Sequence, residues 1–167
     1  DIGCYPVSMA RHITGVLNNK NFLNPVSIEG NGELNDQGID LNASAILIFE
    51  DGSKAEIKSA TNLSSESEVI ISDGETTIIV NQPWHCGEFT DRQSEIKIIN
   101  SSGAEEIIEI SSDKGIYALE IDHFTQNFNS KNIESHTLPH NDSHGNMITL
   151  DSWRRDLKVV YLSLIHI

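Results

Sequence analysis

The chain has 167 residues, of which 38% are hydrophobic, and its 11 basic and 25 acidic residues give a formal net charge of −14. This acidity disfavours binding to nucleic acid or to an anionic membrane surface, because both need clustered lysine and arginine. Two cysteines, Cys4 and Cys86, do not make a disulfide framework, so we expect a reducing, cytoplasmic environment. No stretch approaches the ~20 apolar residues of a membrane span.

Residues 1–17 are predicted to pass from a loop into a helix near Pro6, since proline fits the first helical turn. One apolar stripe follows at helical spacing: Met9, Ala10, Ile13, Val16 and Leu17. The helix would hold Asp1 and Tyr5 at its N-terminal end, where the helix dipole favours negative charge. Residue types alone favour a helix cap for Asp1 and a packing role for Tyr5.

The middle of the chain is predicted to form strands joined by short hairpins. Asp51-Gly52, Asp73-Gly74 and residues 100–103 supply the turn chemistry. Apolar and other residues alternate along 41–49, as in a strand with one buried face. The expected strands span residues 25–34, 41–49, 54–60, 68–72, 76–80, 95–99 and 105–110. Because hairpins join neighbouring strands, the sheet should be largely antiparallel.

Two further helices are predicted, over 116–129 and 142–157, the second capped by Asp142 or Ser143. Their apolar stripes are Tyr117, Ile121, Phe124 and Phe128 in the first, and Met147, Leu150, Trp153 and Leu157 in the second. The order of elements predicts an α+β fold: one open, mostly antiparallel sheet with helices packed on one face. The other face must be covered, and a homodimer or higher homo-oligomer through the sheet is one solution.

Two patterns that suggest ligand sites are rejected on local grounds. Gly30-Asn31-Gly32 lacks the third glycine of a dinucleotide-binding turn and lies inside a strand pattern. His136, His140 and His144 recur every four residues, but Pro139 interrupts any helix between them, so a solvated loop is expected in place of a metal site.

Trp84 and His85 follow Pro83 at the end of a predicted strand. An aromatic face suits a sugar ring and His85 adds a polar group, so both are candidate substrate contacts. The alternative is an ordinary loop anchored by a packed Trp84. Cys86 and His85 do not form a nucleophile pair, because neighbours on an extended chain point apart.

The opening run Asp1-Ile2-Gly3-Cys4-Tyr5-Pro6 resembles a motif of the Gfo/Idh/MocA oxidoreductases, in the branch of glucose–fructose oxidoreductase and dimeric dihydrodiol dehydrogenase. The likeness continues in order through residues 49–55, 73–84, 117–124 and 142–155. The resemblance implies that Asp1 contacts substrate, that Tyr5 is the acid/base and that His140 approaches the substrate. It also implies an NAD or NADP cofactor bound mainly by a preceding domain, which carries a Glu-Lys-Pro motif that this chain lacks.

On this resemblance, residues 1–161 are expected to be the C-terminal, substrate-binding domain of an NAD(P)-dependent oxidoreductase. The intact enzyme would act on a CH–OH group of a sugar, polyol or trans-dihydrodiol, whereas this chain alone should bind no dinucleotide and be inactive. Residues 162–167 resemble a translated DNA-library adaptor and are interpreted as a non-native tail. The alternatives are a non-catalytic β-rich oligomerisation module and a carbohydrate-binding domain that uses Trp84.

Overall fold

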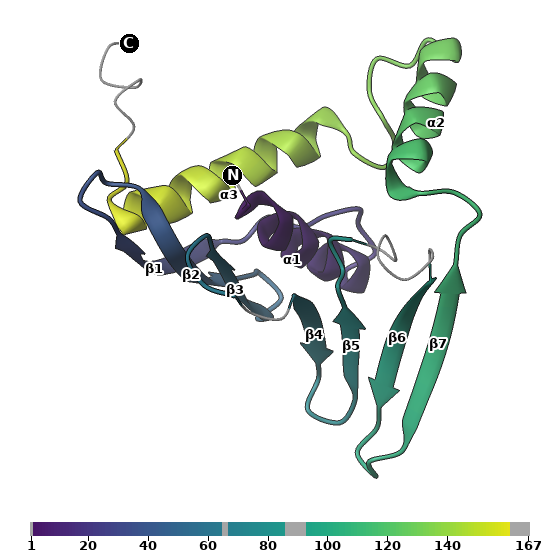
Figure 1. Cartoon of the computed structure of the whole chain (residues 1–167), viewed down its shortest axis with the longest axis horizontal. Coiled ribbons are helices and arrows are strands. Elements are labelled where there is room, and N and C mark those ends of the chain that lie inside the picture. The colour runs from purple at the N-terminus through teal and green to yellow at the C-terminus, as the bar shows by residue number, and fades with distance from the viewer. Residues whose placement is uncertain (1, 65–66, 86–92, 161–167) are drawn as a thin grey trace. The chain divides into compact units, whose positions relative to one another are not determined.

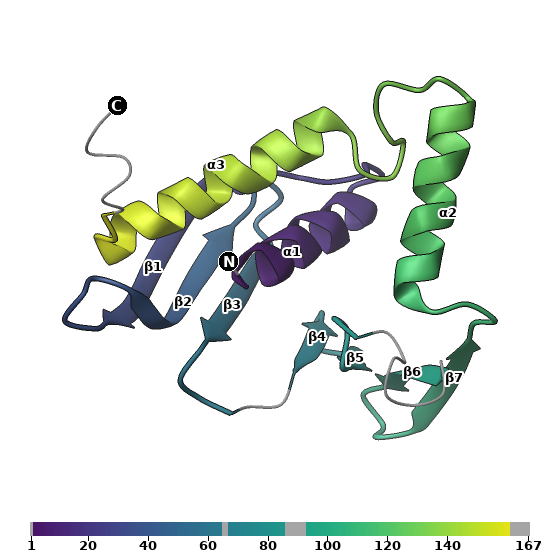
Figure 2. The ribbon, with the colours of Figure 1, turned by 45° about the horizontal axis from the view of Figure 1, so that its top comes forward.

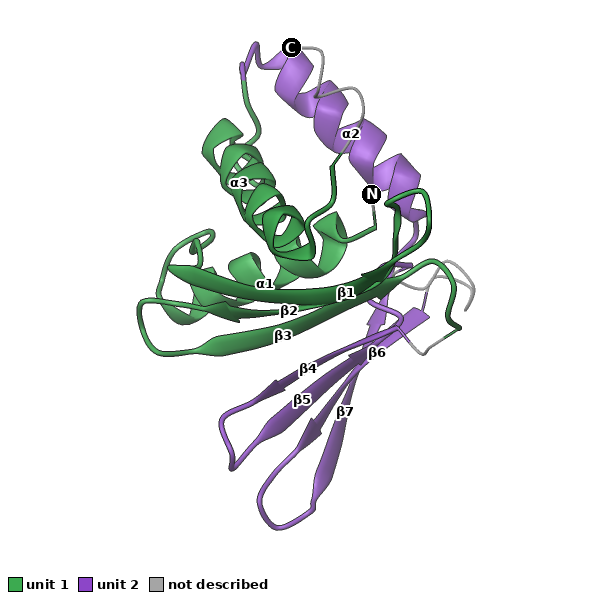
Figure 3. Ribbon diagram, turned by 90° about the vertical axis from the view of Figure 1, so that its left-hand side faces the viewer, with its two compact units in different colours: residues 1–64, 134–167 green, residues 65–133 purple. Residues whose placement is uncertain are grey.

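The computed structural model describes residues 2–64, 67–85 and 93–160. Within these ranges the chain forms three helices and seven strands (Figures 1 and 2). The chain divides into two compact units, one of residues 1–64 with 134–167 and one of residues 65–133 (Figure 3). Both sheets are antiparallel, so the predicted α+β class is confirmed.

The first unit is a three-stranded sheet covered by two helices. Its sheet has the order β1-β2-β3, and α3 packs on β1 and β2 while α1 packs on β3 and on α3 (Figure 2). The elements are α1 (Cys4–Leu17), β1 (Ser27–Leu34), β2 (Asp40–Ile48), β3 (Lys54–Ala60) and α3 (His140–Leu157). The two helices therefore lie over one face of this sheet, as the sequence predicted.

The core of the first unit follows the alternation of β2. Ala43, Ala45 and Leu47 are buried, and Phe49 continues the pattern just beyond the strand. Ile57 of β3 lies opposite Ala45, and Trp153 of α3 completes the buried cluster. The period-two pattern in the sequence thus identified the buried face of the central strand correctly.

Helix α1 buries a different face from the one predicted. Val7, Ala10, Arg11 and Thr14 are buried, whereas Val16 and Leu17 are exposed. Residues 7, 10, 11 and 14 have the i, i+3, i+4, i+7 spacing of one helix face. The prediction failed because the apolar stripe was chosen by residue type, and this buried face contains an arginine and a threonine.

Helix α3 begins two residues earlier than predicted, with Pro139 as its N-cap residue and no side-chain capping bond. Asp142 therefore lies in the first turn and does not cap the helix. Met147 was predicted to be buried but is 55% exposed. Thr149 is buried in its place.

The glycines of β1 allow α3 to approach the sheet closely. A Cβ on Gly30 would lie 2.8 Å from Cδ1 of Trp153 and 2.9 Å from Cβ of Asp156. The amide of Gly30 donates a 2.8 Å hydrogen bond to Oδ2 of Asp156, which satisfies a donor on an edge strand. Gly30-Asn31-Gly32 is thus a helix-packing surface, which explains its glycines without a phosphate.

The second unit is a four-stranded sheet of order β4-β5-β6-β7, followed by a helix. Its elements are β4 (Glu68–Ser72), β5 (Thr77–Asn81), β6 (Gln93–Ile99), β7 (Glu105–Ser111) and α2 (Ile116–Asn129). The expectation of a single sheet was wrong, because among the described strands no hydrogen-bonded ladder joins β3 to β4. The predicted stripe of α2 exists, but its four side chains are 64–70% exposed.

Candidate active site

Tyr5 lies in the first turn of α1, as predicted, and its side chain is 54% exposed. Its amide donates a 3.3 Å hydrogen bond to the carbonyl of Ile2, which closes the turn that starts the helix. Asp1, the predicted substrate contact, lies outside the described residues. The structure thus places one of the two motif residues at an accessible helix start.

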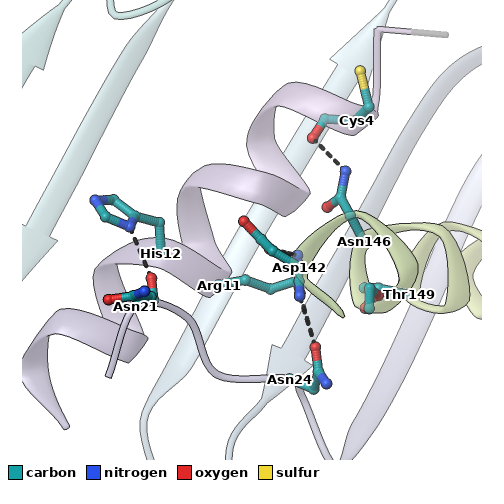
Figure 4. Close-up of polar contacts among 9 residues, drawn as sticks. Cys4, Arg11, His12, Asn21, Asn24, Asp142, Asn146 and Thr149 are labelled. Carbon is teal, nitrogen blue, oxygen red and sulfur yellow. Dashed lines mark hydrogen bonds and ion pairs between the residues drawn. The ribbon is translucent and has the colours of Figure 1, made fainter. Parts of the chain in front are cut away.

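Helix α3 supports the start of α1. A Cβ on Gly3 would lie 3.1 Å from Cζ3 of Trp153, so the first turn rests on the indole. Asn146 points its amide group at the carbonyl of Cys4, with Nδ2 3.5 Å away (Figure 4). Its Oδ1 is buried and has no hydrogen-bond partner among the described residues. Contacts from α3 therefore set the position of the turn that carries Tyr5.

A buried arginine joins the same two helices about two turns further along α1. Arg11 is 0% exposed, and its Nη1 donates a 2.6 Å hydrogen bond to Oδ1 of Asp142. Its Nε and Nη2 donate to Oδ1 of Asn24, at 3.0 and 2.8 Å (Figure 4). The guanidinium also lies 5.0 Å from the ring centroid of Phe22.

Burial lowers the pKa of Arg11 below its ordinary value, and the hydrogen bond and charge of Asp142 oppose that shift. Gly145 makes the arrangement possible, since a Cβ there would lie 2.4 Å from both Nη2 of Arg11 and Oδ1 of Asn24. This network was not predicted from the sequence. The sequence feature that could have revealed it is the helical spacing of Arg11 with Val7, Ala10 and Thr14, which puts all four on one face.

His140 is the first residue of α3 and lies in the same unit as Tyr5. Its side chain is 72% exposed, with Nδ1 3.6 Å from Oε2 of Glu134. Its amide donates a 2.8 Å hydrogen bond to the same oxygen. His136 and His144 are also exposed, and among the described residues no group of three His, Cys, Asp or Glu side chains could hold a metal ion.

Trp84 and His85 lie in a turn after β5, in the second unit. Both are half-buried, and the amide of His85 donates a 3.1 Å hydrogen bond to the carbonyl of Gln82. Pro83, which precedes Trp84, is buried, so the turn is anchored. Cys86 lies outside the described residues.

The first unit also contains an open cleft of about 220 Å³ between α3 and residues 24–28. Ile148, Ser152 and Arg155 line its helical side, and Tyr5 is not among its lining residues. None of the described helices is long and apolar enough to cross a membrane.

No protein-family model matches the sequence, and no curated protein matches it. Solved structures do match the fold. One is a mutant of KijD10, a 3-ketoreductase from Actinomadura kijaniata in complex with TDP-benzene and NADP, with a TM-score of 0.71 and 18% identity. Another is the UDP-N-acetylglucosamine 3-dehydrogenase GnnA from Acidithiobacillus ferrooxidans, with a TM-score of 0.69 and 12% identity.

Each match covers 93% of this chain but only 46% of the matched chain. The chain thus spans about half the length of these solved structures. Within that half, this chain shares the fold of the matched structures.

Proposed function

We propose that this chain is the C-terminal, substrate-binding domain of an NAD(P)-dependent oxidoreductase that acts on a CH–OH group, most simply of a sugar. The observation that carries the proposal is the fold match over 93% of the chain to an NADP-bound 3-ketoreductase and to a sugar-nucleotide 3-dehydrogenase. The opening motif, with Tyr5 in the first turn of a helix, agrees with it.

Gly30-Asn31-Gly32 does not fit a phosphate group. The one glycine pair that resembles a phosphate-binding turn packs against Trp153 and Asp156, which leaves no room beside Gly30. We therefore propose that NAD or NADP is held mainly by a further domain of the intact protein, and we assign no cofactor contact to these residues.

Tyr5 is proposed to exchange the hydroxyl proton of the substrate. A free phenol has a pKa of ~10, so this role needs a neighbouring cation or another source of positive potential. The start of α1 supplies part of that potential, because unpaired amides there carry partial positive charge. Asp1 would orient the substrate, and His140, Trp84 and His85 remain proposed substrate contacts.

The test begins with the DNA upstream of the Asp1 codon, which should encode about one domain of 100–150 residues with a Gly-x-Gly-x-x-Gly turn. In the intact enzyme, Tyr5→Phe removes only the phenolic oxygen. We expect turnover to fall by roughly 10²–10⁴-fold, the usual contribution of a general acid/base, while substrate still binds by calorimetry.

Tyr117→Phe is the matched control, because Tyr117 is an exposed tyrosine of α2 with no proposed catalytic role. It should leave turnover unchanged. Full activity of Tyr5→Phe would remove Tyr5 from the mechanism. A start codon just upstream of Asp1 would instead favour a binding or oligomerisation module.

A further inference from the structure

Asn31-Gly32 is the only Asn-Gly pair in the chain, and it lies in an edge strand. Both residues are exposed, and among the described strands β1 pairs with β2 alone (Figure 2). A glycine has no Cβ to shield its own amide nitrogen or to restrict rotation of the backbone. The pair therefore joins an exposed side-chain amide to an unshielded main-chain nitrogen.

The amide of Gly32 points away from the β1–β2 ladder. Successive amides of a strand point alternately to its two sides, and the Gly30 amide points away from β2, towards Asp156. The Gly32 amide points the same way and donates a 2.9 Å hydrogen bond to Oδ1 of Asn31. This bond holds the side-chain amide of Asn31 beside the nitrogen of the next residue.

Asparagines in two exposed turns hold their side chains differently. Oδ1 of Asn35 and Oδ1 of Asn100 each accept hydrogen bonds from the amides two and four residues further on. Such turns direct the side chain past the adjacent nitrogen. Of these three asparagines, Asn31 is thus the one whose side chain contacts the amide that follows it.

We propose that Asn31 is a site of spontaneous deamidation through a cyclic succinimide. The Gly32 nitrogen gives up its proton to hydroxide and attacks Cγ of Asn31, and the side-chain nitrogen takes a proton from water and leaves as ammonia. Water then opens the ring, at the Cγ carbonyl to give aspartate or at the main-chain carbonyl to give isoaspartate. Overall one water is consumed and one ammonia is released, and the reaction requires neither an enzyme nor a cofactor.

Ring closure requires Asn31 to leave its extended conformation, so β1 must first separate locally from β2. An edge strand has one neighbour, and it has fewer hydrogen bonds to break than a central strand. The ladder is also irregular close by, where the register shifts between Glu33 and Leu34. We therefore expect the folded chain to react more slowly than the unfolded chain, but at a measurable rate.

The two products should affect the fold differently. Isoaspartate lengthens the main chain by one methylene, but a Cβ on Gly32 would already lie 2.6 Å from the carbonyl oxygen of Asn42 and 2.8 Å from Cδ2 of Leu157. Aspartate keeps the chain length and adds a carboxylate to the face that carries Glu29 and Glu33. Isoaspartate should therefore loosen α3 from β1, whereas aspartate should do little more than add charge.

The test is incubation of the purified chain in mildly alkaline buffer, folded or in urea, followed by digestion and mass spectrometry. Isoaspartate is measured separately with protein isoaspartyl methyltransferase. In the folded chain Asn31 should react at least about tenfold faster than Asn35 or Asn100, which corresponds to a barrier about 1.4 kcal/mol lower. An intact Asn31 in the folded chain, at times when the unfolded chain has reacted, would overturn the proposal, as would equal rates at the three asparagines.

Two variants serve as matched controls. Asn31→Gln moves the side-chain amide one methylene further away and should block the reaction, so its melting temperature should not change on incubation. The unaltered chain should lose melting temperature as isoaspartate accumulates, and freshly prepared Asn31→Asp should melt close to the fresh unaltered chain. An equal loss in Asn31→Gln would assign the change to another site and overturn the proposed effect on α3. None of these results bears on Tyr5, so the proposed function would stand or fall separately.

Discussion

A single buried cation links the first and last helices of the first unit. Arg11 is fully buried, and its three nitrogens contact the side chains of Asn24 and Asp142. Removing one partner of such a pair leaves the other charge buried and costs about 3–5 kcal/mol, far more than the pair itself contributes to stability. Arg11 therefore matters because of the charge that its loss would leave behind.

Arg11→Met should lower the free energy of unfolding by about 3–5 kcal/mol, because it leaves the largely buried carboxylate of Asp142 unpaired. Arg11→Met with Asp142→Leu should recover much of that loss, since no buried charge remains. Chemical denaturation monitored by circular dichroism measures both. Lys58→Met breaks an exposed pair with Glu56 and should change stability by less than about 1 kcal/mol. An Arg11→Met effect as small as that of Lys58→Met would contradict this account.

Asp51 gives the first unit a pH dependence in the acid range. Hydrogen bonds from Ser53 Oγ, from Asn18 Nδ2 and from the amide of Ser53 lower the pKa of Asp51 from 3.8 to about 2. A depressed folded-state pKa contributes stability above pH 3.8, and that contribution is lost as the pH falls towards 2.

The melting temperature of the unaltered chain should exceed that of Asp51→Asn by a constant amount above pH 4, and the gap should close between pH 4 and pH 2. Melting curves over this interval measure the gap. A gap that stays constant down to pH 2 would contradict this account. It would show that the pKa of Asp51 is no lower in the folded chain than in the unfolded chain.

At the scale of elements, the turns and strands that depend only on neighbouring residues were predictable. The Asp-Gly turn of β2–β3 and the alternation of β2 follow from local chemistry, and both appear as expected. The buried face of α1 was not predictable from apolar residues, because Arg11 is buried only when Asn24 and Asp142 come from elsewhere in the chain. The predicted start of α3 was wrong because the residue before the helix is Pro139, which makes no side-chain capping bond.

The glycines of β1 provide a test at this scale. Gly30→Ala places a Cβ 2.8 Å from Trp153 and 2.9 Å from Asp156, so α3 must shift. Overpacking of this kind typically costs 1–3 kcal/mol, and we expect about that loss in the free energy of unfolding. Gly115→Ala is the matched control, because nothing lies within 4 Å of its Cβ position. A Gly30→Ala chain as stable as Gly115→Ala would show that this contact is not tight.

At the scale of the whole molecule, the class and the strand pairing followed from the sequence, but the division into two sheets did not. Hairpin signals specify which neighbours pair, and they carry no information about whether one hairpin extends the sheet of another. For the candidate site too, the sequence predicted local positions but not which residues share a unit. Tyr5 could be placed at a helix start from its motif, whereas Trp84 and His85 belong to the other unit.

The discontinuity of the first unit has a consequence for synthesis on the ribosome. Residues 1–64 leave the ribosome before residues 134–167, which complete the unit. Until Asp142 has been made, Arg11 would have to be buried without its counter-ion, which costs several kcal/mol. All seven described strands are therefore synthesised before α1 can take its final position on β3 and α3. Of the three described helices, α1 is translated before the other two, yet it is among the last elements to reach its final packing.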